Sequence, residues 1–429
     1  MTSSSASRTI ILHPSLKQHR HQADDQARLE EAMGLALAID LEIVQADIVP
    51  LAQITPRSYL GTGKVDEYKG LIAGNAIGLV IIDSKVSPIQ QRNLEKAWNC
   101  KVIDRTALIL EIFGQRARTG EGKLQVDLAA LEYQKSRLVR SWTHLERQRG
   151  GFGFLGGPGE KQIESDRRVI NEQITKIKQE LETVVRTRAL HRQARRTVPY
   201  PIVALVGYTN AGKSTLFNRL TGAEVLAEDK LFATLDPTMR MVILPSKRKI
   251  ILSDTVGFIS DLPTELVAAF RATLEEVTEA DLLLHIRDIS HPYSNQQKED
   301  VLKVLVNLGL ESSLDRRLVE VLNKVDMLST SPDTSFDEKR FAVSALSGEG
   351  CDALLAHLDR LLGQADHHVM VTLPATNGKL LSWIYDHAEV IERRDIDDAI
   401  TVAIRIADKE YGRLQGLSET QAKIKMRHA

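Results

Sequence analysis

The chain has 429 residues, about three times the length of a typical domain, so two to four domains are expected. Its composition, 43% apolar and 26% charged, is ordinary for a folded globular protein and far from that of a disordered or fibrous chain. No apolar run approaches the ~18 residues of a membrane span, and the N-terminus lacks a signal-peptide core. Cys100 and Cys351 are too few for a disulfide framework or a cysteine zinc site, which favours a reducing cytoplasm.

The formal net charge of −1 is unevenly distributed along the chain. Residues 116–196 hold 18 Lys/Arg against 10 Asp/Glu, a local charge of +8 that leaves about −9 for the remainder. A basic segment in an otherwise acidic chain is typical of a module that meets a polyanion. A solvated pair of charged helices would have the same composition, so charge alone leaves both interpretations open.

The first 119 residues alternate strand-like and helix-like patterns. Strands are expected at 9–13, 41–49, 76–83 and 100–104, and helices at 24–39, in a stretch ending near Ala73, and at 88–98. This alternation predicts a small, mainly parallel sheet. The segment Gly61-Thr62-Gly63-Lys64 is too short for a nucleotide fingerprint and is interpreted as a glycine-rich turn.

Residues 120–197 have a helical periodicity instead. Apolar residues recur at steps of 3, 4 and 7 in two runs, which are Leu124, Leu128, Leu131, Leu138, Trp142 and Leu145, then Ile163, Ile170, Ile174, Ile177, Leu181 and Val184. Such runs predict a long antiparallel helical hairpin. Six glycines among residues 150–159 exclude a helix at its tip, where Phe152, Phe154 and Leu155 have no local core.

Two further units follow the hairpin. In residues 198–365, strands are expected at 202–206, 240–245, 249–254, 281–286, 318–323 and 340–344, with helices between them. Residues 366–429 are expected to contain a strand at 369–374, a helix at 378–390 and a strand at 399–406. The polar tail beyond Gly416 is expected to fray.

Residues 207–214 match the phosphate-binding pattern G-x-x-x-x-G-K-[ST], between an apolar strand and an amphipathic helix. The glycines let backbone N–H groups wrap a β-phosphate at the helix N-terminus. Lys213 can neutralise the β- and γ-oxygens, and the Ser214 hydroxyl can bind Mg²⁺. The nucleotide-binding residues expected here are Gly207, Tyr208, Thr209, Asn210, Ala211, Gly212, Lys213, Ser214 and Thr215.

A second motif, Asp254-Thr255-Val256-Gly257, ends the strand expected at 249–254. An acid at a strand end can hold the shell of Mg²⁺ through water, and the Gly257 amide can reach a γ-phosphate. Gly257 is followed by Phe258. A phenyl ring cannot hydrogen-bond a water and so cannot orient one for attack on the γ-phosphate, and we expect slow intrinsic hydrolysis.

A third motif, Asn323-Lys324-Val325-Asp326, ends the strand expected at 318–323. The Asp326 carboxylate can accept two hydrogen bonds from guanine that adenine cannot offer. Asn323 would tie this loop to residues 207–214, and the Lys324 stem would cover the base. Ser344-Ala345-Leu346 follows the next strand, where the Ala345 amide could meet guanine O6.

The loop between the first two motifs offers hydroxyls for Mg²⁺ and a γ-phosphate. Thr234 and Thr238 both qualify chemically, and a capping role stays open for each. The nucleotide-binding residues expected in this loop are Phe232, Ala233, Thr234, Leu235 and Asp236.

Four guanine-nucleotide motifs in this order resemble the TRAFAC class of GTPases, and longer phrases resemble the HflX family of the Obg–HflX superfamily. The similar segments are GYTNAGKSTLFN (207–218), LFATLDPT (231–238), DTVGFI (254–259), LPTELVAAFRATLEE (262–276), NKVD (323–326) and, upstream, SPIQQRNLEKAW (87–98), VIDRTALILEIFGQRART (102–119), EGKLQVDLAALEYQKSRLVR (121–140), WTHLERQRGG (142–151) and GPGE (157–160). Two positions depart from the family pattern: Lys161 stands where a threonine is common, and Arg287 interrupts an apolar strand.

The resemblance implies an α/β protein of four parts. These are an N-terminal α/β domain (1–119), a helical hairpin linker (120–197), a P-loop GTPase domain (198–365) and a small C-terminal α+β domain (366–429). It implies binding of GTP, GDP and Mg²⁺, with Ser214 and Thr234 as metal ligands and with Lys213, Thr234 and Gly257 in catalysis.

The resemblance also implies a partner, the large ribosomal subunit and its rRNA near the peptidyl-transferase centre, and GTP-dependent splitting of stalled or stressed ribosomes. We expect a cytoplasmic monomer with no DNA partner and no integral membrane segment, and peripheral attachment to a membrane is left open. A GTPase of ribosome assembly or RNA modification is an alternative. A non-enzymatic RNA-binding protein stabilised by nucleotide is another, although intact Lys213, Ser214 and Asp254 argue against it.

The hairpin tip is expected to contact rRNA. Its aromatic rings can stack on unpaired bases while flanking basic residues contact phosphates. The basic residues that flank the tip are Arg147, Arg149, Lys161, Arg167 and Arg168. The opposing interpretation is that the loop folds back and packs Phe152 and Phe154 against a neighbouring domain.

Overall fold

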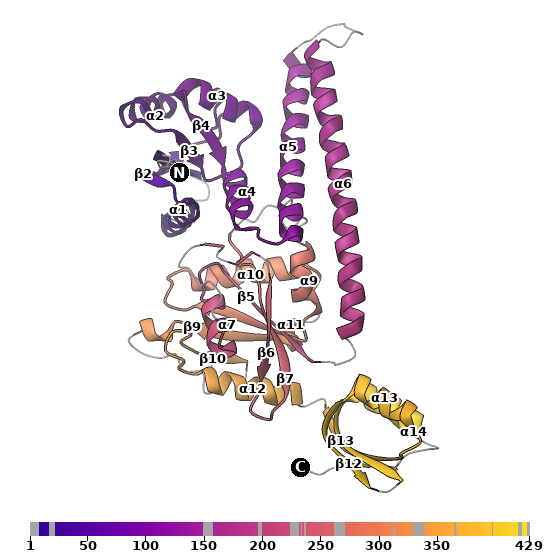
Figure 1. Cartoon of the computed structure of the whole chain (residues 1–429). Helices are drawn as coiled ribbons and strands as arrows, with labels where there is room; N and C mark the ends of the chain where they lie inside the picture. The colour runs from indigo at the N-terminus through magenta and orange to yellow at the C-terminus, as the bar shows by residue number, and fades with distance from the viewer. Residues whose placement is uncertain are drawn as a thin grey trace, which may run out of the picture.

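The computed structural model describes residues 8–16, 22–148, 158–195, 200–223, 231–232, 234–235, 237–260, 271–311, 314–328, 339–363, 366–396, 398–418 and 423–426. Several residues singled out in the sequence therefore lie outside the described residues: Ala233, Asp236, Arg149, Phe152, Phe154, Leu155 and all of 262–270. Three sheets, one long helical hairpin and the helices that cover the sheets make up the described chain (Figure 1). Within it, no helix combines the length and apolar character that a bilayer crossing requires.

The N-terminal sheet is entirely parallel, in the order β2-β1-β3-β4. Its elements are β1 (Arg8–Leu16), α1 (Gln22–Leu37), β2 (Glu42–Leu51), α2 (Thr62–Gly74), β3 (Leu79–Ile82), α3 (Pro88–Trp98), β4 (Lys101–Asp104) and α4 (Arg105–Arg116). All four residues of β3 are buried, as expected for a parallel strand covered on both faces. The turn expected at 61–64 is instead the start of α2, with Gly61 as its N-cap.

Local signals explain where the helices of this unit begin. Helix α3 follows a capping box in which the Ser87 hydroxyl accepts from the Gln90 amide at 3.3 Å and the Gln90 side chain accepts from the Ser87 amide at 2.9 Å. Helix α4 follows Asp104, whose Oδ1 accepts from the Ala107 amide at 2.9 Å. The end of β4 and the start of α4 are therefore fixed by one side chain.

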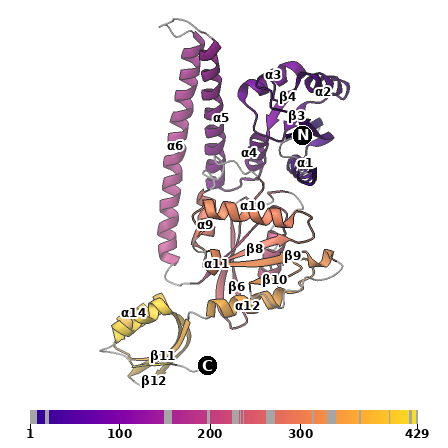
Figure 2. The same cartoon turned by 180° about the vertical axis from the view of Figure 1, so that it is seen from behind.

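Helices α5 (Gly120–Gln148) and α6 (Pro158–Arg195) form the antiparallel hairpin that the apolar periodicity predicts. The two helices project well beyond the rest of the molecule, and the end at which α5 finishes and α6 begins is remote from the C-terminal sheet (Figures 1 and 2). The Tyr133 hydroxyl donates to Asp104 Oδ1 at 2.8 Å, and Arg137 Nη1 donates to Asp104 Oδ2 at 3.2 Å. These contacts fasten α5 to the N-terminal sheet.

The central sheet has the order β10-β9-β8-β5-β7-β6, and only β6 is antiparallel to its neighbour. Its elements are β5 (Ile202–Gly207), α7 (Lys213–Thr221), β6 (Thr238–Ile243), β7 (Lys249–Asp254), α9 (Arg271–Glu279), β8 (Leu282–Asp288), α10 (Ser294–Asn307), α11 (Leu314–Arg317), β9 (Leu318–Asn323), a 3-10 turn (Val325–Met327), β10 (Arg340–Ala342) and α12 (Cys351–Gly363). This is the P-loop α/β architecture expected from the sequence, and the predicted fold class is confirmed.

The C-terminal sheet is antiparallel, in the order β12-β13-β11-β14. Its elements are β11 (Asp366–Pro374), α13 (Gly378–His387), β12 (Glu389–Ile396), β13 (Ala399–Ala407), α14 (Asp408–Ser418) and β14 (Lys423–Met426). Two expectations were wrong. The helix predicted to reach residue 390 ends at His387, and the tail predicted to fray contains β14, which pairs with β11.

One apolar core continues from the N-terminal unit into the central one. Phe113 of α4 packs edge-on against Phe232, with ring centroids 4.6 Å apart. Gly34 of α1 lies so close to Leu231 that an added Cβ would be 3.0 Å from the leucine Cδ1. The N-terminal helices thus cover the loop that carries Thr234.

Candidate nucleotide-binding site

The parallel strands β5, β7 and β9 bring the sequence motifs to one edge of the central sheet. Leu205 pairs with Asp254 across β5 and β7, and Asp288 pairs with Asn323 across β8 and β9. Residues 207–214 leave β5 at the same edge. Loops at the carboxyl ends of parallel strands form the ligand crevice of open α/β sheets.

Ser214, Thr234 and Asp254 meet in one cluster. Asp254 Oδ2 accepts from Ser214 Oγ at 2.7 Å and from Thr234 Oγ1 at 3.0 Å, and the two hydroxyls are 2.9 Å apart. Burial raises the pKa of Asp254 above its ordinary value, although the Ser214 hydrogen bond opposes the shift. Its other oxygen, Oδ1, is buried and has no hydrogen-bond partner among the described residues. Thr238 instead begins β6, where its backbone pairs with Asp254, and the role of Thr234 stays a prediction.

Lys213 is buried beneath residues 207–209. The residue is only 6% exposed, and its Nζ donates to the carbonyl oxygens of Gly207 at 3.1 Å and Tyr208 at 2.7 Å. Burial lowers the pKa of Lys213 to about 8, although the nearby Asp254 carboxylate opposes this shift. The ammonium group is thus poorly compensated by the protein alone, which suits a lysine whose partner is a phosphate.

Gly257 lies against this lysine. A Cβ at Gly257 would be 2.8 Å from Thr209 Cα and 3.0 Å from Lys213 Nζ, so no larger residue fits. The following residue pairs with the first motif through its backbone: the Thr209 amide donates to Phe258 O at 2.8 Å, and the Phe258 amide donates to Gly207 O at 3.1 Å. The second motif is therefore held directly on the first.

Asn323 joins the third motif to the first. Its Nδ2 donates to Ala211 O at 2.8 Å, and its Oδ1 accepts from the Ala345 amide at 3.0 Å. At Gly212, where φ is +89°, an added Cβ would be only 2.2 Å from Asn323 Nδ2. The predicted contact between the two loops is therefore present. The Ala345 amide, which was predicted to meet guanine O6, donates to Asn323 instead.

The remaining base-side residues surround that tie. Lys324 Nζ lies 2.7 Å from Asp288 Oδ2, and Asp326 is exposed in the 3-10 turn beside it. Ser344 is fully buried, whereas Leu346 is 72% exposed. The predicted contacts of these side chains with a base stay predictions.

The side chains of Phe232 and Leu235 belong to the apolar core. Both were expected to contact nucleotide, yet Phe232 is 2% exposed and Leu235 is 3% exposed. Only their main chain is left for such a contact. The Phe258 ring, 1% exposed, packs into the same core.

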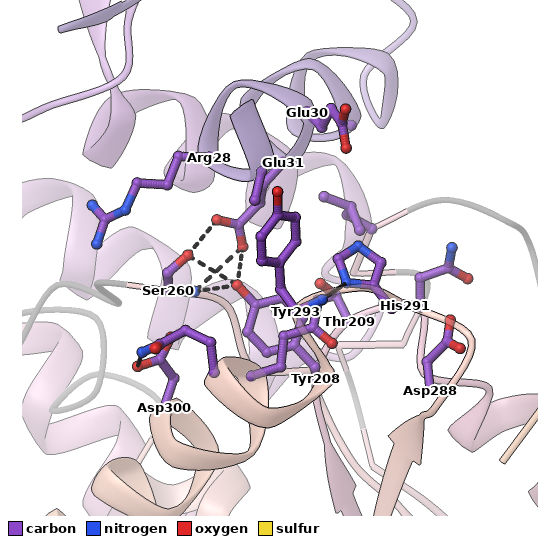
Figure 3. A pocket seen from close by; sticks show the side chains of 16 residues that line it. Arg28, Glu30, Glu31, Tyr208, Thr209, Ser260, Asp288, His291, Tyr293 and Asp300 are labelled. Atoms are coloured by element: carbon purple, nitrogen blue, oxygen red, sulfur yellow. Dashed lines mark hydrogen bonds between the residues drawn. The ribbon is translucent and has the colours of Figure 1, made fainter. Parts of the chain in front are cut away.

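Three residues beside the site were missed in the sequence. Glu31 of α1 accepts hydrogen bonds from the Tyr208 hydroxyl and from Ser260 Oγ (Figure 3). Arg105 of α4 donates to Glu31 and to the Ser260 carbonyl. They are 74 to 229 residues apart in sequence, so no local pattern could have paired them. The cluster borders a cavity of about 350 Å³ between α1, residues 208–210 and the start of α10.

Comparison with known proteins agrees with this architecture. Four family models match successive parts of the chain: "GTP-binding GTPase N-terminal" at residues 26–114, "GTP-binding GTPase Middle Region" at 116–195, "50S ribosome-binding GTPase" at 202–324 and "HflX C-terminal domain" at 333–423. A GTP-binding protein from Sulfolobus solfataricus, solved in complex with GDP, is 23% identical, covers 83% of this chain and 99% of its own, and has a TM-score of 0.45.

Relatives of higher identity span almost the whole sequence. GTPase HflX of Magnetococcus marinus is 51% identical over 399 residues, which are 92% of each chain. GTPase HflX of Escherichia coli is 42% identical over 401 residues, 92% of this chain and 93% of its own. The chain therefore belongs to the HflX family of GTPases and hydrolyses GTP.

Proposed function

We propose that this GTPase depends on Mg²⁺, binds the large ribosomal subunit and uses GTP to split stalled or stressed ribosomes. The parts would be residues 1–119, the hairpin 120–197, the GTPase domain 198–365 and the C-terminal domain 366–429. The observation that carries the enzymatic half is the convergence of Lys213, Gly257 and the Ser214–Thr234–Asp254 cluster at one sheet edge.

The phosphate chain of GTP would lie along residues 207–215. Backbone N–H groups at the start of α7 would bind phosphate oxygens, and Lys213 would exchange its two carbonyl partners for the β- and γ-oxygens. The Gly257 amide would donate to the γ-phosphate. Because Phe258 is buried in the core, water would be positioned by the backbone here or by a group supplied from outside the chain.

The residues around Asp254 fit a magnesium ion. Oxygen donors are the ligands that Mg²⁺ prefers, and two hydroxyls and a carboxylate lie within hydrogen-bond distance of one another. Asp254 Oδ1 is buried and has no hydrogen-bond partner in the described part of the chain. Such an oxygen is suited to bind a cation or a water of its coordination shell. Ser214 and Thr234 would hold the ion and Asp254 its shell, and the bound ion would neutralise charge on the phosphates.

Thr234→Ala should slow GTP hydrolysis by roughly tenfold or more while GDP binding stays near that of the wild type, because a charge-assisted contact of about 1.5–3 kcal/mol is lost only in the GTP-bound state. The measurement is phosphate release at saturating GTP across a series of Mg²⁺ concentrations. Thr238→Ala is the matched control and should stay within about threefold of wild type. Equal effects of the two substitutions would contradict the assignment of Thr234.

Guanine would be selected at the third motif. The exposed Asp326 carboxylate would accept from guanine N1–H and the 2-amino group, and Asn323 would keep that loop fixed to residues 207–214. Contact between the Ala345 amide and guanine O6 would require that amide to leave Asn323 or to be shared with it.

The ribosomal half of the proposal is supported by the family and by the hairpin. Residues 116–196, which contain almost all of the hairpin, carry the local charge of +8, and the described basic side chains of Arg167 and Arg168 are exposed. A basic projection reaching away from the body is suited to enter a crevice of rRNA (Figure 1). We propose that the tip contacts rRNA near the peptidyl-transferase centre of the large subunit.

Replacing residues 151–158 by a Gly/Ser linker should abolish ribosome splitting and weaken stimulation by the large subunit. Intrinsic GTP hydrolysis should stay near wild type, because the site lies at the far end of the hairpin. The measurement is light scattering of purified ribosomes with the protein and GTP, alongside phosphate release. The combined substitutions Phe152→Ala, Phe154→Ala and Leu155→Ala keep the loop length and test base stacking, worth roughly 1–3 kcal/mol per ring.

A loop variant that splits ribosomes at the wild-type rate would overturn the tip assignment. A wild-type protein that hydrolyses GTP and binds the large subunit but never separates 70S particles would favour the alternative, a GTPase of ribosome assembly.

A further inference from the structure

A buried polar cluster connects the N-terminal unit to the GTPase site. We define it as Glu31, Arg105, Tyr208 and Ser260. The Ser260 amide donates to the Tyr208 hydroxyl oxygen at 2.7 Å, and the two hydroxyls are 2.9 Å apart. Glu31 accepts from both hydroxyls (Figure 3). Arg105 Nη2 donates to Glu31 Oε2 at 2.8 Å. Tyr208, Arg105 and Ser260 are each less than 10% exposed.

The N-terminal unit supplies a second carboxylate partner for the Arg105 guanidinium of this cluster. Arg105 Nη1 donates to Asp83 Oδ1 at 2.6 Å, and His13 Nδ1 lies 2.8 Å from the other oxygen of Asp83. Burial alone would raise the pKa of Asp83, but Arg105 holds it below its ordinary value. Burial and then the Glu31 charge raise the pKa of Tyr208, so its hydroxyl stays a neutral donor. The Glu31 carboxylate is therefore the shared acceptor for Tyr208, Ser260 and Arg105.

The cluster fixes the segment that begins at Gly257. The backbone of this segment is held at Phe258 by the paired contacts with Gly207 and Thr209, and at Ser260 by the Tyr208 hydroxyl and the Arg105 guanidinium. The Gly257 amide precedes both points of attachment. The Phe258 side chain cannot hydrogen-bond water. The groups of this segment that can bind the γ-phosphate or a water are therefore its backbone amides, and their position matters for hydrolysis.

We propose that Glu31 and Arg105 are positioning residues of the GTPase reaction, acting through Tyr208 and Ser260 to set the position of the Gly257 amide. They belong to α1 and α4, so the N-terminal unit completes the hydrolytic site of the central one. This inference rests on the role proposed above for Gly257.

Glu31→Gln tests the inference with the side-chain shape preserved. We expect kcat for intrinsic GTP hydrolysis to fall about tenfold while KM and GDP affinity stay within about twofold, since misplacement of a group that acts in the transition state lowers kcat selectively. Glu30→Gln makes the same chemical change one residue away, on an exposed side chain, and should leave kcat unchanged.

A double-mutant cycle separates positioning from general stabilisation. Tyr208→Phe should lower kcat to a similar extent, and Glu31→Gln combined with Tyr208→Phe should be no slower than the slower single variant, because both act through one contact. Thermal melting of the full-length variants, with and without GDP, reports folding independently. If Glu31→Gln does not fold, Ser260→Ala replaces it in the cycle.

Unchanged or raised kcat in Glu31→Gln and Tyr208→Phe would overturn the inference. So would losses of kcat that merely follow the loss of folded protein or of nucleotide affinity. Failure of the site assignment itself would look different, because Lys213→Ala would then still bind GTP.

Discussion

Lys213→Ala is expected to abolish measurable GTP binding while the chain stays folded. The ammonium group is buried and its only described partners are two backbone carbonyls, so the substitution removes the main positive charge facing a phosphate chain that carries about four negative charges. Because burial lowers the pKa of this lysine to about 8, keeping it protonated near neutral pH costs stability in the nucleotide-free chain, and its removal should leave the fold intact. Titration with a fluorescent GTP analogue and a thermal melt measure the two halves of the prediction.

Lys64→Ala is the matched control for this experiment. Lys64 also follows a glycine, in the sequence Gly61-Thr62-Gly63, but it lies half-buried in the first turn of α2 and pairs with Glu67 at 2.7 Å. Its removal should leave GTP affinity unchanged. Unchanged GTP affinity in Lys213→Ala itself would refute the assignment of residues 207–214 to phosphate binding.

Asp326→Asn should lower GTP affinity by one to several orders of magnitude and raise affinity for XTP. The substitution turns one acceptor into a donor, which opposes the 2-amino group of guanine but matches the carbonyl of xanthine. Each charge-assisted bond lost should cost roughly 1.5–3 kcal/mol, which corresponds to about ten- to hundredfold in Kd. Competition between GTP and XTP for the variant measures the exchange directly.

Asp352→Asn controls for the loss of one negative charge in the same unit. Asp352 is exposed at the start of α12, outside the third motif, and its substitution should leave the GTP to XTP ratio unaltered. A variant at Asp326 that still prefers GTP over XTP would show that another group reads the base.

Local signals were sufficient for much of the fold. Helix α3 and strands β7 and β9 have the predicted bounds, because a Ser-Pro start, buried β-branched runs and terminal polar motifs all act within a few residues. The four nucleotide motifs were found for the same reason. Each is contiguous, and each follows a strand that the apolar pattern predicts.

The C-terminal unit shows where local signals fail. Residues 389–396 contain charges on both faces of the strand, and they follow a helix without a glycine or proline to mark its end. Strand β14 has four residues and acquires its structure from pairing with β11, more than fifty residues earlier. Sheet pairing of this kind is decided by tertiary contacts rather than by intrinsic preference.

The candidate site also contains residues that local sequence signals identify and residues that only tertiary contacts bring to the site. The sequence alone leaves Thr234 and Thr238 open, and the structure places the Thr234 hydroxyl against Ser214 and Asp254. Phe232 and Leu235 lie in a loop whose sequence suggested nucleotide contact, yet their apolar side chains are more stable in the core shared with α4. Glu31 and Arg105 carry no motif at all, and their role depends wholly on how two units pack.

The adjacency of Asp104 and Arg105 has a thermodynamic consequence. Asp104 holds the hairpin through Tyr133 and Arg137, whereas the next residue holds Ser260 beside the nucleotide. When two binding events act on one rigid junction, their coupling free energy is reciprocal. If rRNA at the hairpin tightens GTP binding tenfold, GTP must tighten rRNA binding tenfold, about 1.4 kcal/mol in each direction. On the proposed binding of rRNA, a GDP-bound chain that lacks this coupling would bind rRNA more weakly by the same increment, so GTP hydrolysis would set the time of dissociation.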